Sequence, residues 1–371
     1  MDEFIQQGIR PKQIGYFSFT KKAATEAATR AAEKFGLDIE NDLSNFRTLH
    51  SLAFRNLGMT KEKMMKQEDY KEFGQKCGIP IKTAKYSAED GTFNSDNEYL
   101  TIINTARVKR MDLLEYYDSR KNTLDIERST LFLLAEELER YKKEKGLKDF
   151  TDLLEDFIEK SLPGSLEVLF IDEAQDLSLI QWEMVRHLWK YAKKTYIAGD
   201  DDQAIFKWAG ADVDHFIALK EEVNDIKVLD QSYRIPGGPI HELSQNIINK
   251  VQNRFEKTYK PRDEIGLLKR YSDITQVDMS KGNWLVLSSA NYFLDDAKDL
   301  CEIQGWYYQY KGMNSVSLKL LLALNNWESW RKGEWLNHLE IKNIYQYLGS
   351  NVAVGYQKGK TLHSDAKYTL K

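Results

Sequence analysis

The chain is poor in cysteine and proline. Its 371 residues include two cysteines, Cys77 and Cys301, which are far apart in the sequence. This spacing argues against a disulfide framework and against a zinc site. We therefore expect the protein to work in a reducing cytoplasm. The six prolines leave little room for disordered Pro-rich linkers.

Long apolar runs and an excess of positive charge are also missing. No apolar run approaches the length that crosses a bilayer, and the first residues lack the basic-then-apolar layout of a signal peptide. We therefore expect no membrane partner. The net charge is −4, so the chain has no overall basic field that would attract nucleic acid. Any contact with DNA must come from a local groove.

The most informative stretch is Val-Leu-Phe-Ile at residues 168–171, followed by Asp-Glu-Ala-Gln-Asp at residues 172–176. The apolar run predicts a buried strand in the centre of a parallel sheet. Ligands bind beyond the carboxyl ends of such strands. Asp172 could hold a hydrated Mg²⁺ there, and Glu173 could orient or deprotonate an attacking water. The alternative is a strand that ends in an acidic turn without a catalytic role.

Strands and helices are expected to alternate on both sides of this stretch. Residues 14–19, 195–198 and 226–229 predict strands. An Ala-rich helix follows the first of them, with Thr20 as its N-cap and Gly36 as its end.

The remaining segments suggest an insertion and a second domain. Residues from about 60 to 160 are mainly helical and charged, which predicts a helical insertion. The prolines after Arg234 place a domain boundary just beyond that residue. Beyond the boundary the expected strands are 284–288 and 306–310, and the expected helices are 293–304 and 318–348.

Six segments, in this order, resemble the motifs of superfamily 1 DNA helicases of the UvrD/Rep/PcrA type. They are Phe-Thr-Lys-Lys-Ala-Ala at 19–24, Thr-Leu-His-Ser-Leu at 48–52, Asp-Phe-Thr-Asp-Leu-Leu at 149–154, the acidic segment at 172–176, Gly-Asp-Asp-Asp-Gln-Ala-Ile-Phe-Lys-Trp-Ala-Gly at 199–210, and Gln-Ser-Tyr-Arg at 231–234. The acidic segment is similar to the Walker B box. Six motifs in the right order are a strong signal.

The resemblance implies an α/β fold with two RecA-like parts. Residues 1–234 would form a parallel-sheet P-loop NTPase domain that contains the helical insertion at about 60–160. Residues 235–312 would form part of a second RecA-like domain. Residues 313–371 would be a truncated helical insertion or extension.

The resemblance also implies an ATP-dependent DNA helicase or translocase with ATP and Mg²⁺ as cofactors. Such a protein moves on single-stranded DNA and unwinds duplex junctions, with 3′-to-5′ polarity, in replication, repair or recombination. Hydrolysis needs a metal, a positioned water, a γ-phosphate sensor and a cation for the developing charge. Asp172 and Glu173 would serve the metal and the water, and Gln203 would be the sensor. Arg234 would be the cation, unless it forms a surface ion pair, and Tyr233 could stack on the adenine.

The aromatic pair Phe206 and Trp208 is the candidate platform for single-stranded DNA. Bases stack on aromatic rings whatever their sequence, and Lys207 between the two rings favours an exposed surface over core packing. By the resemblance, four further residues would line the same groove: Phe19, Thr20, Thr48 and His50.

The phosphate-binding loop Gly-x-x-x-x-Gly-Lys-Ser/Thr is not found in the 371 residues. The segment 355–361 ends in Gly-Lys-Thr, but it is one residue short between the glycines, and we interpret it as a coincidence. Nothing after Gly312 resembles the last helicase motifs. We therefore expect a partial helicase that requires a missing N-terminal segment or a split-gene partner. The alternatives are a non-hydrolysing DNA-binding module and the motor part of a helicase–nuclease.

Overall fold

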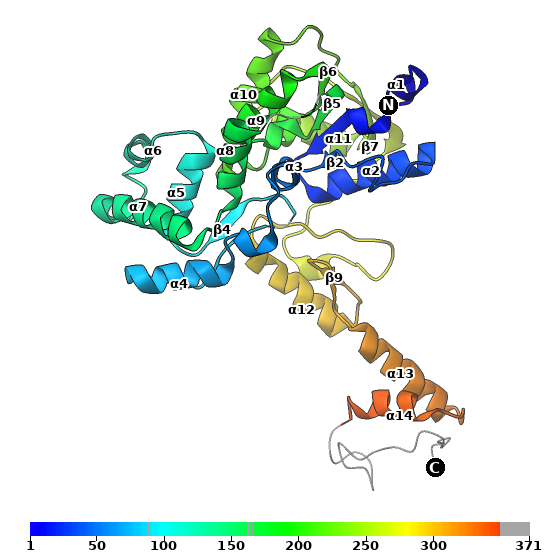
Figure 1. Ribbon diagram of the computed structural model, residues 1–371. Coiled ribbons are helices and arrows are strands. Elements are labelled where there is room, and N and C mark those ends of the chain that lie inside the picture. Colours follow the sequence, from blue (N-terminus) through cyan, green and yellow to red (C-terminus); the bar gives the residue numbers. More distant parts are fainter. Residues whose placement is uncertain (88, 162–163, 165, 349–371) are drawn as a thin grey trace. The chain divides into compact units, whose positions relative to one another are not determined.

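The computed structural model describes residues 1–87, 89–161, 164 and 166–348 (Figure 1). The chain forms two compact units, Met1–Leu267 and Leu268–Lys371. Each unit is described by itself below. The segment 355–361, which resembles a phosphate-binding loop, lies outside the described residues.

A parallel sheet of four strands, in the order β2-β1-β5-β6, forms the centre of the first unit. The strands are β1 (Ile14–Ser18), β2 (Phe46–Arg47), β5 (Leu166–Asp172) and β6 (Ala192–Ile197). Strand β5 pairs in parallel with β1 on one side and with β6 on the other. The prediction of a central parallel strand ending at Asp172 is therefore confirmed.

Helices cover both faces of this sheet. On one face, Phe4 of the first helix is buried against Ile14 and Val168. On the other face, Phe17 and Leu169 belong to a larger apolar core. The helices of the first face are α1 (Asp2–Gln6) and α2 (Lys21–Phe35), and those of the second face are α3 (Leu49–Asn56), α8 (Phe150–Lys160) and α9 (Leu179–Trp189). This arrangement of helices around a parallel sheet confirms the predicted α/β fold and is consistent with a RecA-like domain.

Helix α2 has the two ends that the sequence predicted. The Thr20 side chain accepts a hydrogen bond from the backbone N–H of Ala23 at 3.2 Å, which satisfies one of the free amides of the first turn. Gly36 ends the helix in the left-handed conformation, with φ of 64°.

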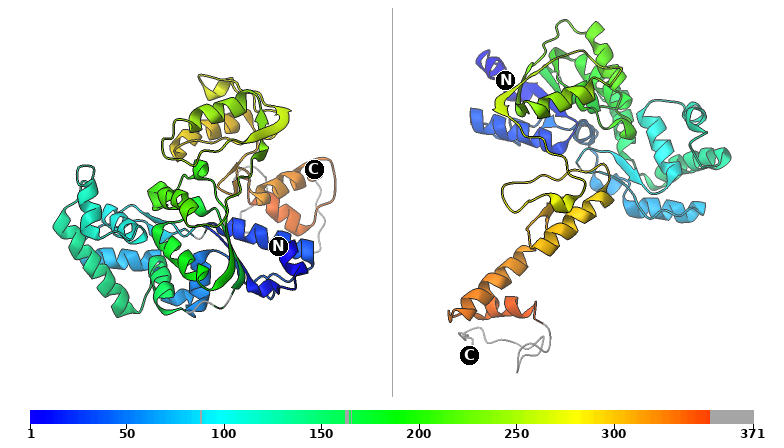
Figure 2. Two further views of the ribbon diagram at one scale, coloured as in Figure 1. Left: turned by 90° about the horizontal axis from the view of Figure 1, so that it is seen from above. Right: turned by 180° about the vertical axis from the view of Figure 1, so that it is seen from behind.

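The helical insertion has its own core. Its elements are α4 (Gln67–Cys77), β3 (Ala84–Tyr86), β4 (Phe93–Ser95), α5 (Glu98–Val108), α6 (Leu113–Arg120) and α7 (Arg128–Lys145). Buried Leu131, Leu134 and Leu138 of α7 pack in this core, as their helical spacing indicates. In both views of Figure 2 the insertion lies on the opposite side of the sheet from α1.

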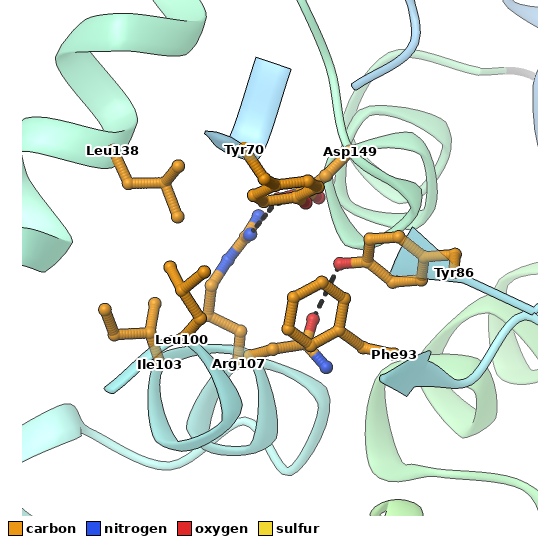
Figure 3. Close-up of a pocket in the computed structure, with 9 residues that line it drawn as sticks. Tyr70, Tyr86, Phe93, Leu100, Ile103, Arg107, Leu138 and Asp149 are labelled. Atoms are coloured by element: carbon orange, nitrogen blue, oxygen red, sulfur yellow. Dashed lines mark hydrogen bonds and ion pairs between the residues drawn. The ribbon is translucent and has the colours of Figure 1, made fainter. Parts of the chain in front are cut away.

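Buried charges fasten α5 and α7 of the insertion to α8, which lies within the predicted range of about 60–160 but packs in the core of the sheet. Lys142 Nζ lies 3.0 Å from Asp149 Oδ2 and 2.8 Å from Asp152 Oδ1. Arg107 Nη1 lies 2.7 Å from the same oxygen of Asp149, and Figure 3 shows its guanidinium directed at that carboxylate, beside a cavity of about 10 Å³. Because Asp149 and Asp152 also form the capping box of α8, the start of this helix is fixed by the insertion.

The rest of the first unit follows β6. It contains α10 (Val213–Ala218), β7 (Gln231–Gly237), α11 (Pro239–Ile248) and β8 (Lys260–Ile265), and β7 pairs in parallel with β8. The second unit contains α12 (Asp295–Gln304), β9 (Gln309–Tyr310), β10 (Met313–Asn314), α13 (Leu318–Arg331) and α14 (His338–Tyr345). No helix of the described residues is long and apolar enough to cross a membrane.

Two of the expected strands do not form. Residues 226–229 and 284–288 have no regular secondary structure. Leu229 is 82% exposed and Leu287 is 80% exposed. An apolar run predicts a strand only when a neighbouring strand can take its backbone hydrogen bonds, and among the described residues neither segment has such a neighbour.

Candidate functional site

The acidic residues after β5 lie at the carboxyl edge of the sheet. Asp172 is the last residue of β5, and the exposed Glu173 follows it with φ of 53°. This left-handed conformation is costly for a residue with a side chain. It is held by two backbone bonds to the neighbouring strand end, from Ala198 N–H to Ile171 O at 2.8 Å and from Ala174 N–H to Ala198 O at 3.0 Å. Strain of this kind is concentrated at functional sites.

The buried side chain of Gln175 joins the ends of β5 and β6. Its Nε2 donates to Glu173 Oε2 at 2.8 Å, and its Oε1 accepts from the backbone N–H of Asp200 at 3.0 Å. A β-carbon added at Gly199 would lie 2.7 Å from Gln175 Oε1, so a glycine is needed for this close approach. The structure therefore brings Glu173 and the turn that carries Gln203 into one network.

The surroundings of Asp172 suit a hard cation. Its Oδ1 accepts the backbone N–H of Glu173 at 3.1 Å, and its Oδ2 accepts the hydroxyl of Tyr16. Each oxygen keeps a further lone pair. Ser18 is paired with Asp172 in the sheet register, and its buried Oγ has no hydrogen-bond partner among the described residues. These oxygen donors match the preference of Mg²⁺, which takes one or two carboxylates and keeps several waters.

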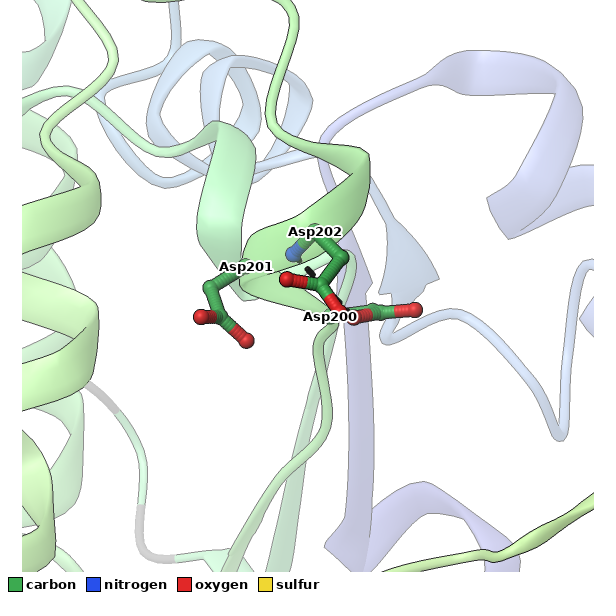
Figure 4. Close-up of side chains that lie close together, drawn as sticks. All are labelled: Asp200, Asp201 and Asp202. Carbon is green, nitrogen blue, oxygen red and sulfur yellow. Dashed lines mark hydrogen bonds between the residues drawn. The ribbon is translucent and has the colours of Figure 1, made fainter. Parts of the chain in front are cut away.

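Gln203 is the last residue of a short helical turn, Asp201–Gln203, and Asp200 is the N-cap of this turn. The turn therefore carries three carboxylates, those of Asp200, Asp201 and Asp202. Its Nε2 donates to Asp200 Oδ2 at 2.6 Å, while the rest of the side chain is exposed. Figure 4 shows the three carboxylates close together, and their oxygens lie within 4.8 Å of one another.

Two cations from the segment after α11 neutralise these carboxylates. Arg254 Nη2 lies 2.6 Å from Asp202 Oδ2, and Lys257 Nζ forms ion pairs with Asp200 at 3.0 Å and with Asp201. Burial acts to lower the pKa of Lys257, but the hydrogen bonds and charges of Asp201 and Asp200 raise it overall. Burial acts to raise the pKa of Asp202, but Arg254 and Lys257 lower it overall. Lys257 and Asp202 therefore keep their charges within the cluster.

Asp176, the last residue of the acidic segment, is a buried carboxyl with an oxygen that has no partner among the described residues. Burial and the charge of Glu173 raise the pKa of Asp176 to about 6. No role for this residue follows from its place in the acidic segment.

The two predicted nucleotide contacts from the Gln-Ser-Tyr-Arg segment at 231–234 lie apart from this network. Tyr233 is 82% exposed, and Arg234 is also exposed on β7. Within the described part of the chain, no hydrogen bond or ion pair joins Arg234 to Glu173 or Gln203.

A groove of about 590 Å³ contains two of the predicted DNA contacts, Thr48 and His50. Thr48 is the N-cap of α3, and its side chain accepts the N–H of Ser51 at 3.2 Å. The ring of His50 lies 5.5 Å from that of Phe150. Burial lowers the pKa of His50 to about 4, against the opposing charge of Asp90, so this histidine is neutral at pH 7 and contributes no positive charge to the groove.

The positive charge of the groove comes from residues that the sequence analysis did not single out. Four cations are among its lining residues: Lys21, Arg47, Lys61 and Lys66. They come from both sides of the Thr-Leu-His-Ser segment, and nothing in the sequence distinguishes them from other surface cations. The groove also contains a carboxylate, Glu89, which accepts the N–H of Lys22 at the start of α2 at 2.7 Å.

The predicted aromatic contacts differ in exposure. Trp208 is 63% exposed, whereas Phe19 is 5% exposed. Phe206 lies between them, with its ring 4.9 Å from that of Phe19 and 6.3 Å from that of Trp208, and it packs against the core. Of the three, only Trp208 offers most of its side chain to a base. Thr20 is occupied as the N-cap of α2.

Comparison with known proteins agrees with this geometry. The profile of the UvrD/REP helicase N-terminal domain matches residues 2–224. ATP-dependent DNA helicase Rep of Buchnera aphidicola subsp. Baizongia pistaciae is 22% identical over 353 residues, which are 91% of this chain and 51% of the relative.

Other relatives match a shorter part of the chain. A probable DNA helicase II homolog of Rickettsia conorii is 30% identical over 275 residues, 67% of this chain and 39% of the relative. ATP-dependent DNA helicase Rep of Escherichia coli is 25% identical over 269 residues, 67% of this chain and 38% of the relative. The chain thus spans about half the length, or less, of these curated relatives. The profile match over 2–224 shows that the chain belongs to the UvrD/REP helicase family.

Proposed function

We propose that this chain is part of an ATP-dependent DNA helicase, which couples ATP hydrolysis to movement on single-stranded DNA and to duplex unwinding. The proposed polarity is 3′ to 5′, and the proposed role is in replication, repair or recombination. The observation that carries the proposal is the link from Glu173 through Gln175 to the turn of Gln203. It joins a water-activating carboxylate to a phosphate sensor at the carboxyl edge of a parallel sheet.

Each proposed role follows from the chemistry of the side chain. Asp172 would hold Mg²⁺, which supplies charge neutralisation at the β- and γ-phosphates. Glu173 accepts a proton from, or orients, the attacking water. One N–H of the Gln203 amide is bonded to Asp200, and the other has no partner among the described residues, so it can bind a phosphate oxygen. Arg234 and Tyr233, both exposed on β7, are proposed to contact the phosphates and the adenine.

Single-stranded DNA is the proposed ligand of the groove and of Trp208. The four cations of the groove can pair with phosphates, and an exposed indole can stack on any base. Duplex junctions are the proposed substrate. Both cysteines are free, which is compatible with the cytoplasm as the proposed location.

The domain assignment stays a proposal. Residues 1–234 would form the first RecA-like motor domain, 235–312 part of a second, and 313–371 a helical extension. Because the relatives are about twice as long or longer, we propose that a phosphate-binding loop is supplied by an N-terminal segment or by a separate polypeptide. A helicase–nuclease could contain the same motor.

A non-hydrolysing module that binds single-stranded DNA is the second candidate. It is favoured by one observation, that no Gly-x-x-x-x-Gly-Lys-Ser/Thr pattern occurs in the 371 residues. Both candidate functions use the proposed DNA groove. Only the helicase needs Glu173, because only the helicase hydrolyses ATP.

Two measurements test the proposal. Arg47→Ala should weaken binding of a labelled single-stranded oligonucleotide and reduce its salt dependence. Arg30→Ala on the outer part of α2, where Arg30 is 77% exposed, should change neither. In a protein that also contains a phosphate-binding loop, single-stranded DNA should stimulate ATP hydrolysis. Equal hydrolysis with and without DNA would refute the motor, and DNA binding without any hydrolysis would favour the second candidate.

A further inference from the structure

The turn that carries Gln203 is held from two sides. On one side Gln175 Oε1 accepts the backbone N–H of Asp200 at 3.0 Å. On the other side Lys257 Nζ lies 3.0 Å from Asp200 Oδ1. The other oxygen of the same carboxylate accepts Gln203 Nε2 at 2.6 Å. Asp200 therefore stands between a cation from a distant segment and the side chain of Gln203.

We propose that Lys257 and Arg254 are positioning residues, which hold the Asp200–Asp202 turn and thereby set the place of the Gln203 amide relative to Glu173. The inference rests on the proposed function for the role of Gln203. The two residues lie outside the six helicase-like segments. They provide the acidic turn with positively charged partners from the same chain.

Charge and burial explain why this contact can position a side chain. Three carboxylates in one turn repel one another unless cations neutralise them. The Lys257 and Arg254 side chains are 15% and 12% exposed, and those of Asp201 and Asp202 are 4% and 12% exposed. Pairs with so little access to water are screened by salt much less than surface pairs. The cluster could also be read as a cation site, but these two side chains already supply its positive charge.

The backbone of the basic segment is fixed at the same time. Asp201 Oδ2 accepts the N–H of Phe255 at 2.7 Å, and Arg254 binds both oxygens of Asp202, at 2.9 Å and 2.6 Å. A bidentate arginine pair fixes orientation as well as distance. Movement of residues 254–257 would therefore be transmitted to Asp200 and Gln203.

Amide hydrogen exchange of the full chain, without ATP or DNA, tests the proposal. The reporters are the N–H groups of Asp200, Asp202 and Gln203, which are bonded to Gln175 Oε1, Asp200 Oδ1 and Asp200 O. Lys257→Ala should accelerate their exchange by about tenfold or more, the size expected when one charge-assisted hydrogen bond is lost. Lys260→Ala is the matched control, because Lys260 is 74% exposed and pairs at the surface with Asp230, and it should leave these reporters unchanged.

Two substitutions of Lys257 separate positioning from general stability. Lys257→Met keeps the apolar stem and removes the charge, so it should accelerate exchange in the turn as Lys257→Ala does, whereas Lys257→Arg keeps the charge and should retain most of the protection. Faster exchange confined to residues 254–257, equal acceleration over the whole chain, or unchanged exchange in Lys257→Met would each overturn the proposal. Since the measurement needs no hydrolysis, a failure of the proposed ATPase activity would not change its outcome, and the two failures can be distinguished.

Discussion

The hydroxyl of Tyr16 on β1 donates a hydrogen bond to Asp172 Oδ2 at the end of β5. The Tyr16 ring is fixed by stacking on Phe46, with centroids 5.5 Å apart and planes at 14°. Burial, followed by the hydrogen bond and charge of Asp172, raises the pKa of the Tyr16 hydroxyl well above its ordinary value. A tyrosine thus restrains the proposed metal ligand from the neighbouring strand.

This relationship predicts a stability difference at high pH. Above about pH 10 the unfolded chain loses the Tyr16 proton and the folded chain keeps it, so the free energy of unfolding falls as the pH rises. Tyr16→Phe should make this fall shallower by up to about 1.4 kcal/mol per pH unit, the contribution of one proton. Urea unfolding of both proteins at about pH 9 and about pH 11 measures the difference. Equal slopes would contradict the raised pKa.

The buried charge cluster around Asp149 gives a second prediction. Asp149→Ala removes one of the carboxylates that balance the positive charges of Lys142 and Arg107 in a buried site, and it also removes the N-cap of α8. The loss should be about 3–5 kcal/mol of stability. Glu139→Ala is the control, because Glu139 contacts the same Lys142 at 2.7 Å but its side chain is 58% exposed, and this change should cost about 1 kcal/mol or less. Equal losses in urea unfolding would show that burial is not what makes the cluster important.

Local sequence patterns predict the helices and strands whose formation depends on residues close by in the sequence. The apolar run before Asp172, and the Thr20 and Gly36 ends of α2, are examples that the structure confirms. The expected strands at 226–229 and 284–288 fail, because a strand also needs a partner from elsewhere in the chain.

The same limit applies to the site. Asp172, Glu173 and Gln203 could be singled out because their motifs are continuous in sequence. The contact of Lys257 with Asp201 spans 56 residues, and that of Tyr16 with Asp172 spans 156. Neither contact has a sequence pattern that would reveal it. Exposure cannot be read from a motif either. Trp208 is the predicted stacking platform and Phe19 is predicted to line the same groove, but Trp208 is exposed and Phe19 is buried in the structure.

Glu173 gives the third prediction, in a protein that also contains a phosphate-binding loop. Glu173→Gln keeps the size of the side chain and its ability to accept the hydrogen bond from Gln175, but it removes the base. Nucleotide binding should persist, and kcat should fall by about 100-fold or more. Asp172→Asn should instead raise the Mg²⁺ concentration needed for activity. Glu159→Gln, at an exposed position on α8, should behave like the parent. A kcat within a few-fold of the parent for Glu173→Gln would leave the acidic segment with a structural role.

The fourth prediction concerns Trp208. Because this side chain is 63% exposed, Trp208→Ala should weaken binding of single-stranded DNA by about 1–3 kcal/mol with little change in melting temperature. Its removal should also leave the salt dependence of binding nearly intact, since no charge is lost. Trp182→Ala is the contrasting control, because Trp182 is 1% exposed, and it should cost about 3–5 kcal/mol of stability. Anisotropy titrations beside thermal melts compare the two. Unchanged DNA binding in the Trp208 variant would refute the stacking assignment.

The last prediction concerns a carboxylate in the groove that we propose as the DNA-binding site. Glu89 accepts the N–H of Lys22 at 2.7 Å and its backbone carbonyl accepts the N–H of Lys21 at 2.7 Å. The side chain therefore lies at the start of α2, where the helix dipole favours a negative charge, in a groove with four cations. A DNA phosphate in this groove would compete with Glu89 for the same positive potential.

Glu89→Gln keeps a side-chain oxygen for the Lys22 amide and removes the charge. It should tighten binding of a short single-stranded oligonucleotide by up to about tenfold at low salt, because one repulsive charge is lost and phosphate can approach the cations more closely. The gain should shrink as salt is added, since the effect is electrostatic. Glu98→Gln at the start of α5, outside the lining of the groove, is the matched control and should bind like the parent. Anisotropy titrations at several salt concentrations make the comparison. Weaker binding by Glu89→Gln would mean that this carboxylate supports the DNA-binding form of the groove instead of opposing it.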